Sequence, residues 1–144
     1  MSLNLRPLKV DDLLFLLEVR NDESTRNNLE NNSIFKYNEC RAWFESTTPK
    51  WYIIEINRHS VGYIRTDGDE VGCDIHPIYR RKGYARMAYE VYLKDKDYAS
   101  LWVFEDNFAK NLYEKLGFVY NNNLKIIRER NYIQMEYNAT VDNR

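Results

Sequence analysis

The sequence of 144 residues predicts an α/β (α+β) fold whose mixed central sheet starts as an antiparallel meander and continues through a βαβ unit. Three segments rich in β-forming residues, 50–56, 61–66 and 71–75, follow one another closely, and Asp67-Gly68 is a strong hairpin signal between the last two. Segment 71–75 then leads into an amphipathic helix and a further apolar strand. A strand, a helix and a strand in this order form a crossover connection, so the two strands are expected to run parallel.

The region before the meander is predicted to be a short strand, residues 3–8, followed by three helical segments. Asp11 can cap the first helix, because an aspartate there accepts a hydrogen bond from a free backbone N–H. Residues 22–30 and 38–46 are interpreted as the second and third helices, and we expect the region to form a lid or an acceptor-binding wall. The residues expected to face inward are Leu13, Leu14, Leu16, Leu17 and Val19 of the first helix and Cys40, Trp43 and Phe44 of the third.

After the meander, the sequence predicts two further helices and the strands that complete the sheet. The first helix should cover about Gly83–Lys94, with Tyr84, Ala88 and Val91 at helical spacing on one face. Gly117 is placed to end the second helix, because a glycine commonly follows a helix C-terminus. The remaining expected elements are strand 100–104, helix 108–115 with Leu112 and Leu116 buried, a strand starting at 118–120, and a closing strand within 125–137.

Composition favours one globular domain, residues 1–144, in the cytoplasm. Hydrophobic residues make up 44% of the chain and charged residues 30%, which is typical of globular proteins. The net charge of −1 argues against a general nucleic-acid partner or a membrane partner. Two cysteines and two histidines occur at no metal-type spacing, so we expect no metal. Monomer and homodimer both stay open.

One stretch, Val71–Leu93, organises the chemistry that the sequence predicts. Its strand ends at Pro77, which has no N–H for a ladder, and an Arg80-x-x-Gly83-x-Ala85 pattern precedes the helix. A helix N-terminus exposes free N–H groups and a partial positive charge, and a glycine lets an anion approach the backbone closely. The turn is therefore a candidate phosphate site, although an ordinary strand–helix joint with a basic face fits the same pattern.

Together with this pattern, the predicted sheet order resembles the GCN5-related N-acetyltransferase (GNAT) superfamily. A second block, Asn107–Phe118, resembles that family's Asn-x-x-Ala…Leu-Tyr…Gly-Phe segment. The two blocks cover residues 71–118, about a third of the chain. The resemblance implies the GNAT fold and an N-acetyltransferase with acetyl-coenzyme A (acetyl-CoA) as the acetyl-donor cosubstrate. The amine would attack the thioester directly in a ternary complex.

The resemblance also implies which residues bind acetyl-CoA. Ile75, with Asp74 and His76 beside it, would hydrogen-bond the pantetheine arm where the two parallel strands splay apart. Asn107 would contact the cofactor from the far side. Backbone N–H groups of the basic turn would hold the pyrophosphate, and the residues of that turn are Arg80, Arg81, Lys82, Gly83, Tyr84 and Ala85.

Two catalytic roles follow from the same resemblance. Tyr113 would protonate the departing thiolate, since a phenol with a pKa of about 10 is a suitable donor; plain core packing is the alternative for this residue. Relatives that act on protein N-termini often carry a glutamate where this chain has Trp102, which argues against a ribosomal-type protein substrate. The candidates for the general base are Asp74 as the first choice, Glu70, His76, Glu105 and a water chain.

The acceptor is expected to be a small molecule with a primary amine. The pattern Arg20-Asn21…Arg26…Trp43-Phe44 resembles that of GNAT enzymes that acetylate nucleotide-linked amino sugars, so an amino sugar is the first expectation.

Several alternatives to an amino sugar are open. Peptide or protein amines, small antibiotics and polyamines would also supply a primary amine, and Asp22, Glu23 and Glu30 could form the acidic pocket that a polyamine needs. An alternative of a different class is a catalytically silent GNAT module that binds acyl-CoA.

Overall fold

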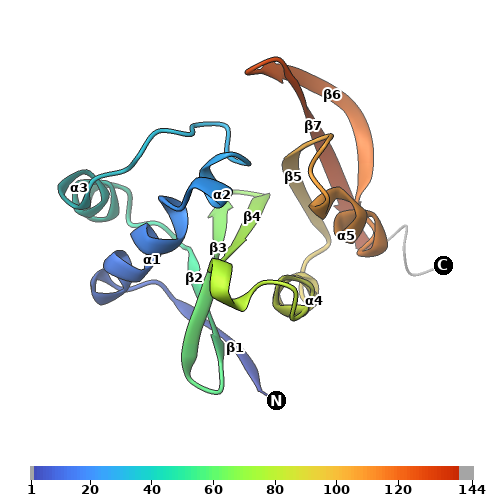
Figure 1. Ribbon diagram of the computed structural model, residues 1–144. Helices are drawn as coiled ribbons and strands as arrows, with labels where there is room; N and C mark the ends of the chain where they lie inside the picture. Colours follow the sequence, from blue (N-terminus) through green and yellow to red (C-terminus); the bar gives the residue numbers. More distant parts are fainter. Residues whose placement is uncertain (1, 140–144) are drawn as a thin grey trace.

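The computed structural model describes residues 2–139 and shows a seven-stranded mixed sheet with helices on both faces (Figure 1). The strand order is β1-β2-β3-β4-β5-β7-β6, which confirms the predicted fold class. The strands are β1 (Leu3–Pro7), β2 (Tyr52–Ile56), β3 (His59–Asp67), β4 (Glu70–Ile75), β5 (Tyr98–Phe104), β6 (Val119–Ile127) and β7 (Arg130–Asn138). The α-helices are α1 (Leu13–Arg20), α2 (Glu23–Arg26), α3 (Tyr37–Thr47), α4 (Tyr84–Leu93) and α5 (Ala109–Lys115).

β2, β3 and β4 form the predicted antiparallel meander, and β1 adds to it by pairing antiparallel with β2. β3 and β4 are joined at the expected hairpin, where Gly68 has a φ of 60°, in the left-handed region that favours glycine. The alternation of side chains along β4 also follows the prediction, with Val71 and Ile75 buried and Cys73 packed against the same core.

The sheet splits between its two parallel strands. β4 and β5 share a single registered pair, Glu70 with Ser100, and the Ser100 N–H donates to the carbonyl oxygen of Asp69 at 2.9 Å. Beyond that point the two strands diverge, as Figure 1 shows. The predicted splaying of the parallel strands is thereby confirmed, and it divides the sheet into a β1–β4 half and a β5–β7 half.

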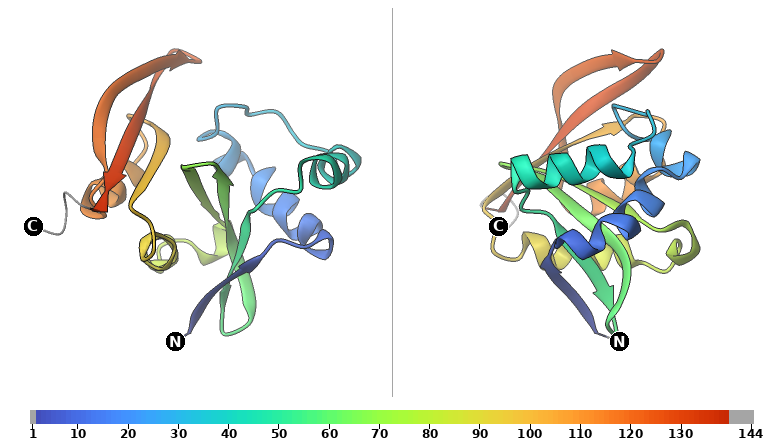
Figure 2. Two further views of the ribbon diagram at one scale, coloured as in Figure 1. Left: turned by 180° about the vertical axis from the view of Figure 1, so that it is seen from behind. Right: turned by 90° about the vertical axis from the view of Figure 1, so that its left-hand side faces the viewer.

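Helices cover both faces of the sheet (Figure 2), and the buried side chains form a separate core on each face. One face is covered by α1 and α3, whose inward residues include the buried Cys40, with Trp43 and Phe44 packed against the cluster as predicted. The other face is covered by α4 and α5, and Tyr89 and Phe118 are among its largest buried side chains.

Two predicted inward residues point outward instead. Leu14 in α1 is 70% exposed and Val91 in α4 is 46% exposed. The buried stripe of α4 contains Ala88 and Tyr89. The buried face of the helix is therefore shifted by one residue from the face on which the prediction places Val91. Three and four residues both span about one helical turn, so a short apolar run fits more than one stripe. Leu112 and Leu116 are half-buried rather than buried.

The C-terminal strands form a longer hairpin than the sequence predicts. β6 continues to Ile127, and the chain turns at Arg128 and Glu129, which have φ values of 49° and 64°. These values suit a two-residue hairpin turn, but that turn normally carries Asn or Gly, so an Arg-Glu pair gives no turn signal. β6 is also an edge strand whose residues are mostly exposed, which leaves no alternation of buried and exposed residues to read.

Three arginines connect α2 to both halves of the split sheet. Arg80 donates from Nε to the Ile75 carbonyl at the end of β4 and from its terminal nitrogens to the hydroxyls of Ser24 and Thr25 in α2. On the other side, Arg128 and Arg130 of the β6–β7 hairpin donate to backbone carbonyls within residues 27–30, just after α2. The Arg130 guanidinium also lies 3.8 Å from the ring centroid of Phe104, at the end of β5.

An ion pair at the N-terminal end of the fold should make stability depend on pH. Asp12 is buried, which by itself raises its pKa, but hydrogen bonds from Arg6 and from the Lys9 N–H, with the Arg6 charge, bring that pKa below its usual value. A lowered native pKa stabilises the fold above about pH 4, and this contribution is lost as the pH falls through the native pKa.

We therefore expect Asp12→Asn to lower the free energy of unfolding by about 3 kcal/mol at pH 6, because Arg6 loses its buried partner. Urea unfolding at pH 6 and pH 3 should show a smaller loss of stability on acidification in the variant than in the wild type. An unchanged pH dependence in Asp12→Asn would show that other carboxylates dominate acid unfolding.

Among residues 2–139, none of the helices is long and apolar enough to cross a membrane. Within the same residues, the acidic, histidine and cysteine side chains form no group of three or more that could hold a metal ion.

Candidate active site

The gap between β4 and β5 presents unpaired strand backbone. The His76 N–H donates to the Val61 carbonyl at 2.8 Å, so the backbone groups of Asp74 and His76 are directed at β3. By alternation, the backbone groups of Cys73 and Ile75 face the gap. Of the three residues expected to meet a pantetheine arm, only Ile75 therefore directs its N–H there.

The basic turn has the geometry of an open helix N-terminus. Arg81 and Gly83 have φ values of 63° and 80°, and α4 starts at Tyr84. The first helical bond runs from the Met87 N–H to the Gly83 carbonyl, which leaves the N–H groups of Tyr84 and Ala85 without intrahelical partners. A Cβ built on Gly83 would meet no atom within 4 Å, so the space in front of this turn is open.

Arg80 does not point its side chain into that space. Each of its three guanidinium nitrogens donates one hydrogen bond, to Ile75, Ser24 and Thr25 respectively, so Arg80 braces β4 against α2. Asn107 is likewise engaged in part: its Oδ1 accepts from the Ala109 N–H at 2.9 Å and caps α5. Its amide nitrogen has no hydrogen bond within the described residues, so it is free to donate.

Tyr113 projects from α5 into the core on the α4/α5 face. Its ring lies 5.5 Å from that of Tyr89 and 6.1 Å from that of Phe118. Burial raises the pKa of Tyr113 to about 12, with a further contribution from nearby Cys73. α5 ends at Lys115, and Gly117, whose φ is 102°, follows its C-terminus as predicted. The Phe118 N–H donates back to the Tyr113 carbonyl at 3.0 Å, which holds the chain against the end of the helix.

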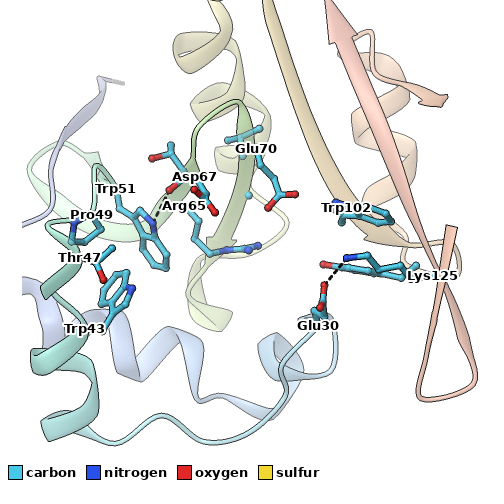
Figure 3. Close-up of a pocket in the computed structure, with 14 residues that line it drawn as sticks. Glu30, Trp43, Thr47, Pro49, Trp51, Arg65, Asp67, Glu70, Trp102 and Lys125 are labelled. Carbon is cyan, nitrogen blue, oxygen red and sulfur yellow. Dashed lines mark hydrogen bonds and ion pairs between the residues drawn. The ribbon is translucent and has the colours of Figure 1, made fainter. Parts of the chain in front are cut away.

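A cavity of about 400 Å³ opens on the opposite face of the sheet, between its two halves (Figure 3). Two pairs of aromatic rings stand on opposite sides of it. Trp43 and Trp51 meet with centroids 4.7 Å apart on one side, and Trp102 stacks on Tyr132 at 5.4 Å on the other. The remaining lining side chains are mostly polar or charged, among them Glu30, Thr47, Arg65, Asp67, Glu70 and Lys125.

An arginine forms the floor of this cavity beside β4. Arg65 Nε lies 2.9 Å from Asp74 Oδ2, and the guanidinium passes directly over Gly72. A Cβ on Gly72 would come within 2.4 Å of that guanidinium, so a glycine is required for Arg65 to lie there. The Asp74 carboxylate is therefore held in place beside the gap by an arginine that the sequence motifs do not identify.

A lysine ammonium is bound within the cavity wall. Lys125 Nζ lies 4.3 Å from the ring centroid of Trp102 and 3.5 Å from Glu30 Oε1. Lys125 is directly opposite Tyr132 in the β6–β7 ladder, so both side chains project from the same face of the sheet. Figure 3 shows the lysine stem beside Trp102, with Glu30 reaching it from the loop after α2.

The other candidates for a general base differ in their surroundings. Glu70 lines the cavity, whereas His76 Nε2 pairs with Glu18 at 2.9 Å and Glu105 accepts from Asn131 at 3.1 Å. Glu70 therefore lines the cavity, whereas Asp74 lies outside its lining and is held by Arg65 on the same face of the sheet. The side chains of His76 and Glu105 are occupied elsewhere.

The polar residues of the pattern that suggests an amino sugar hold a loop instead. Arg20 donates to the carbonyls of Ser33 and Asn31, and Asn21 exchanges hydrogen bonds with the Phe35 backbone. Arg26 donates to Asn21 and Asn32 carbonyls. Among the residues of this pattern, only Trp43 lines the cavity. The hydrogen bonds to the loop explain the polar residues Arg20, Asn21 and Arg26 without a ligand.

Comparison with known proteins identifies the family. The sequence model described as the Acetyltransferase (GNAT) domain matches residues 47–120, more than half of the chain. The chain therefore belongs to the GNAT acetyltransferase family, as the two sequence blocks predict, and its class of activity is acetyl transfer. A comparison with curated proteins finds no significant match.

Solved structures share the fold at low sequence identity. A spermidine N-acetyltransferase from Vibrio cholerae, in complex with CoA and spermine, is 20% identical over 96% of both chains, with a TM-score of 0.87. The protein yncA from Salmonella typhimurium, with its cofactor acetyl-CoA, is 18% identical over 96% of this chain and 94% of its own, with a TM-score of 0.74. An N-acetyltransferase from Staphylococcus aureus Mu50 is 19% identical over 96% and 99%, with a TM-score of 0.67. At these identities the matches show the GNAT fold.

Proposed function

We propose that this protein transfers the acetyl group of acetyl-CoA to a primary amine of a small, flexible, cationic alkylamine, of the diamine or polyamine class. The observation that carries this proposal is the cavity lined by Trp102, Tyr132 and three carboxylates, which lies on one side of the β4–β5 gap. Aromatic faces and carboxylates are the groups with which proteins bind alkylammonium ions.

The other side of the gap has groups that fit acetyl-CoA. The open N–H groups at Tyr84 and Ala85 and the left-handed Gly83 suit a pyrophosphate, with Arg81 and Lys82 adding positive charge. The Ile75 N–H, which faces the gap, suits a pantetheine amide. The free amide nitrogen of Asn107 can donate to a further polar group of the cofactor. When bound, acetyl-CoA supplies an activated thioester.

The division between the two faces supports a simple allocation of roles. Tyr113 lies on the α4/α5 face, and its raised pKa of about 12 keeps the phenol protonated, so it can donate to a thiolate. Asp74 lies on the opposite, cavity-side face, where Arg65 fixes its carboxylate, and it remains our first choice for the base that accepts the amine proton. The amine would then enter from one face while the leaving sulfur is protonated from the other.

The cavity supports an alkylamine better than an amino sugar. A sugar acceptor needs polar side chains free to bind its hydroxyls, and Arg20, Asn21 and Arg26 are occupied by the loop that they hold. An extended alkylammonium needs an aromatic channel with scattered negative charge, which Trp102, Glu30 and Glu70 provide. The structural match to a spermidine N-acetyltransferase in complex with spermine points in the same direction.

An acceptor panel tests the proposal. Purified protein is mixed with acetyl-CoA and spermidine, 1,4-diaminobutane, glucosamine or a nucleotide-linked amino sugar, and released CoA is measured with a thiol reagent. We expect kcat/KM for spermidine to exceed that for either amino sugar at least about a hundredfold. Beyond its reacting amine, neither sugar has a second ammonium to contact the carboxylates and aromatic faces of the cavity.

Other results of the same panel contradict the proposal in different ways. Faster turnover of an amino sugar would restore the first expectation from the sequence. If the protein binds acetyl-CoA but none of the amines in the panel causes release of CoA, the catalytically silent module would be favoured.

A further inference from the structure

We propose that Lys125 occupies the subsite that receives the second ammonium group of the acceptor, so that Lys125 and the acceptor compete for one aromatic and acidic cage. The cage consists of Trp102, Tyr132 and Glu30. This inference rests on the proposed function and adds to it the part of the cavity that selects acceptors with two cationic groups.

The cage already binds an alkylammonium of the right chemistry. A lysine side chain ends in the same CH₂–NH₃⁺ group as a diamine, and Lys125 places it 4.3 Å from the Trp102 centroid and 3.5 Å from a Glu30 oxygen. Trp102 is itself fixed by stacking on Tyr132 at 5.4 Å. A site that holds one primary ammonium by a ring face and a carboxylate can hold another.

Lys125 can leave the cage easily. Its side chain is 48% exposed and that of Glu30 is 55% exposed, and ion pairs at this exposure are weak. The lysine is on the edge strand β6, so its long side chain has solvent on one side into which it can swing.

The charges that remain favour a cation from solution. Once the Lys125 ammonium has left, Glu30, Asp67 and Glu70 line the cavity, and its other cation, Arg65, is already paired with Asp74. An incoming ammonium would replace the lost positive charge beside Glu30. An acceptor with one reacting amine and one neutral end would gain nothing there.

The test removes the lysine charge but keeps its length. Isothermal titration calorimetry without acetyl-CoA measures the binding of two ligands, 1,4-diaminobutane and the uncharged 1,4-butanediol. The proteins compared are the wild type, Lys125→Met, Glu30→Gln and the control Lys94→Met. We expect Lys125→Met to tighten diaminobutane binding about tenfold, because it removes the ammonium that competes for the cage. Glu30→Gln should weaken that binding about tenfold, because it removes the carboxylate that binds a cation there. Butanediol binding and the Lys94→Met control, a lysine exposed at the end of α4, should stay within about twofold of the wild type.

Turnover then separates this inference from the proposed function. With acetyl-CoA present, Lys125→Met should lower KM for diaminobutane but not for 4-amino-1-butanol, which has one amine and a neutral end. Equal effects on both compounds, or no tightening of diaminobutane, would overturn the subsite while leaving the alkylamine function standing. Tightened binding without turnover of any amine would keep the subsite and remove the proposed function.

Discussion

Replacing Tyr113 by phenylalanine should lower kcat about a hundredfold or more while leaving the Kd of acetyl-CoA unchanged, because a general acid contributes roughly 10²–10⁴ to rate. The hydroxyl is the only group removed, and the ring keeps its packing against Tyr89 and Phe118. Since burial raises the pKa of Tyr113 to about 12, the phenol stays protonated, and kcat of the wild type should show no loss from its ionisation below about pH 10.

Tyr89→Phe is the matched control for that experiment. Tyr89 lies beside Tyr113, with ring centroids 5.5 Å apart, and its hydroxyl is buried. Removing that hydroxyl should leave kcat close to that of the wild type. If Tyr113→Phe and Tyr89→Phe behave alike, Tyr113 is a packing residue and its assignment as thiolate donor is wrong.

A glutamate at position 83 should abolish acetyl-CoA binding. Gly83 precedes α4 with a φ of 80° and open space in front of it, so a carboxylate there would project toward the helix N-terminus and repel a pyrophosphate. In the wild type, acetyl-CoA at a hundred times its Kd should add roughly 2.7 kcal/mol to the free energy of unfolding and raise Tm by about 8–10 °C. In Gly83→Glu that shift should disappear.

The strain of the substitution needs its own control, because a non-glycine residue in the left-handed region costs about 1–2 kcal/mol. Gly68→Glu provides it: Gly68 has a φ of 60°, also has no atom within 4 Å of a built Cβ, and lies in the β3–β4 hairpin away from the basic turn. Both variants should lose similar stability, but only Gly68→Glu should keep the acetyl-CoA shift. Absence of a shift in the folded wild type would remove the assignment of the cofactor site.

The parts of the site that sequence analysis finds are those made from neighbours along the chain. Gly83 indicates the turn because the left-handed backbone conformation there favours glycine. Tyr113 can be identified because its spacing from Asn107 and Gly117 along the sequence is that of the family segment. The split of the sheet is also predictable, since it follows from the fold that these two blocks resemble.

The acceptor cavity is harder to predict because it is assembled from distant segments. Arg65, Trp102 and Lys125 come from three strands, and Glu30 reaches them from the loop after α2. No spacing in a single sequence relates such residues. The polar residues near the N-terminus mislead for a related reason: a residue type that suits a ligand, such as Arg20, equally suits a loop carbonyl.

The arginine contacts of α2 have a further consequence for how this protein binds its ligands. At one end of the gap, β4 and β5 are joined by the Glu70–Ser100 pair. At the other end, Arg80 ties β4 to α2, and Arg128 and Arg130 tie the loop after α2 to the β5–β7 half. The gap is thus fixed at both ends, like a slot in a frame. A preorganised slot has little conformational entropy left to lose, so more of the interaction energy of a narrow ligand appears as affinity. Breaking the frame at Arg128 would therefore weaken binding without removing any ligand contact.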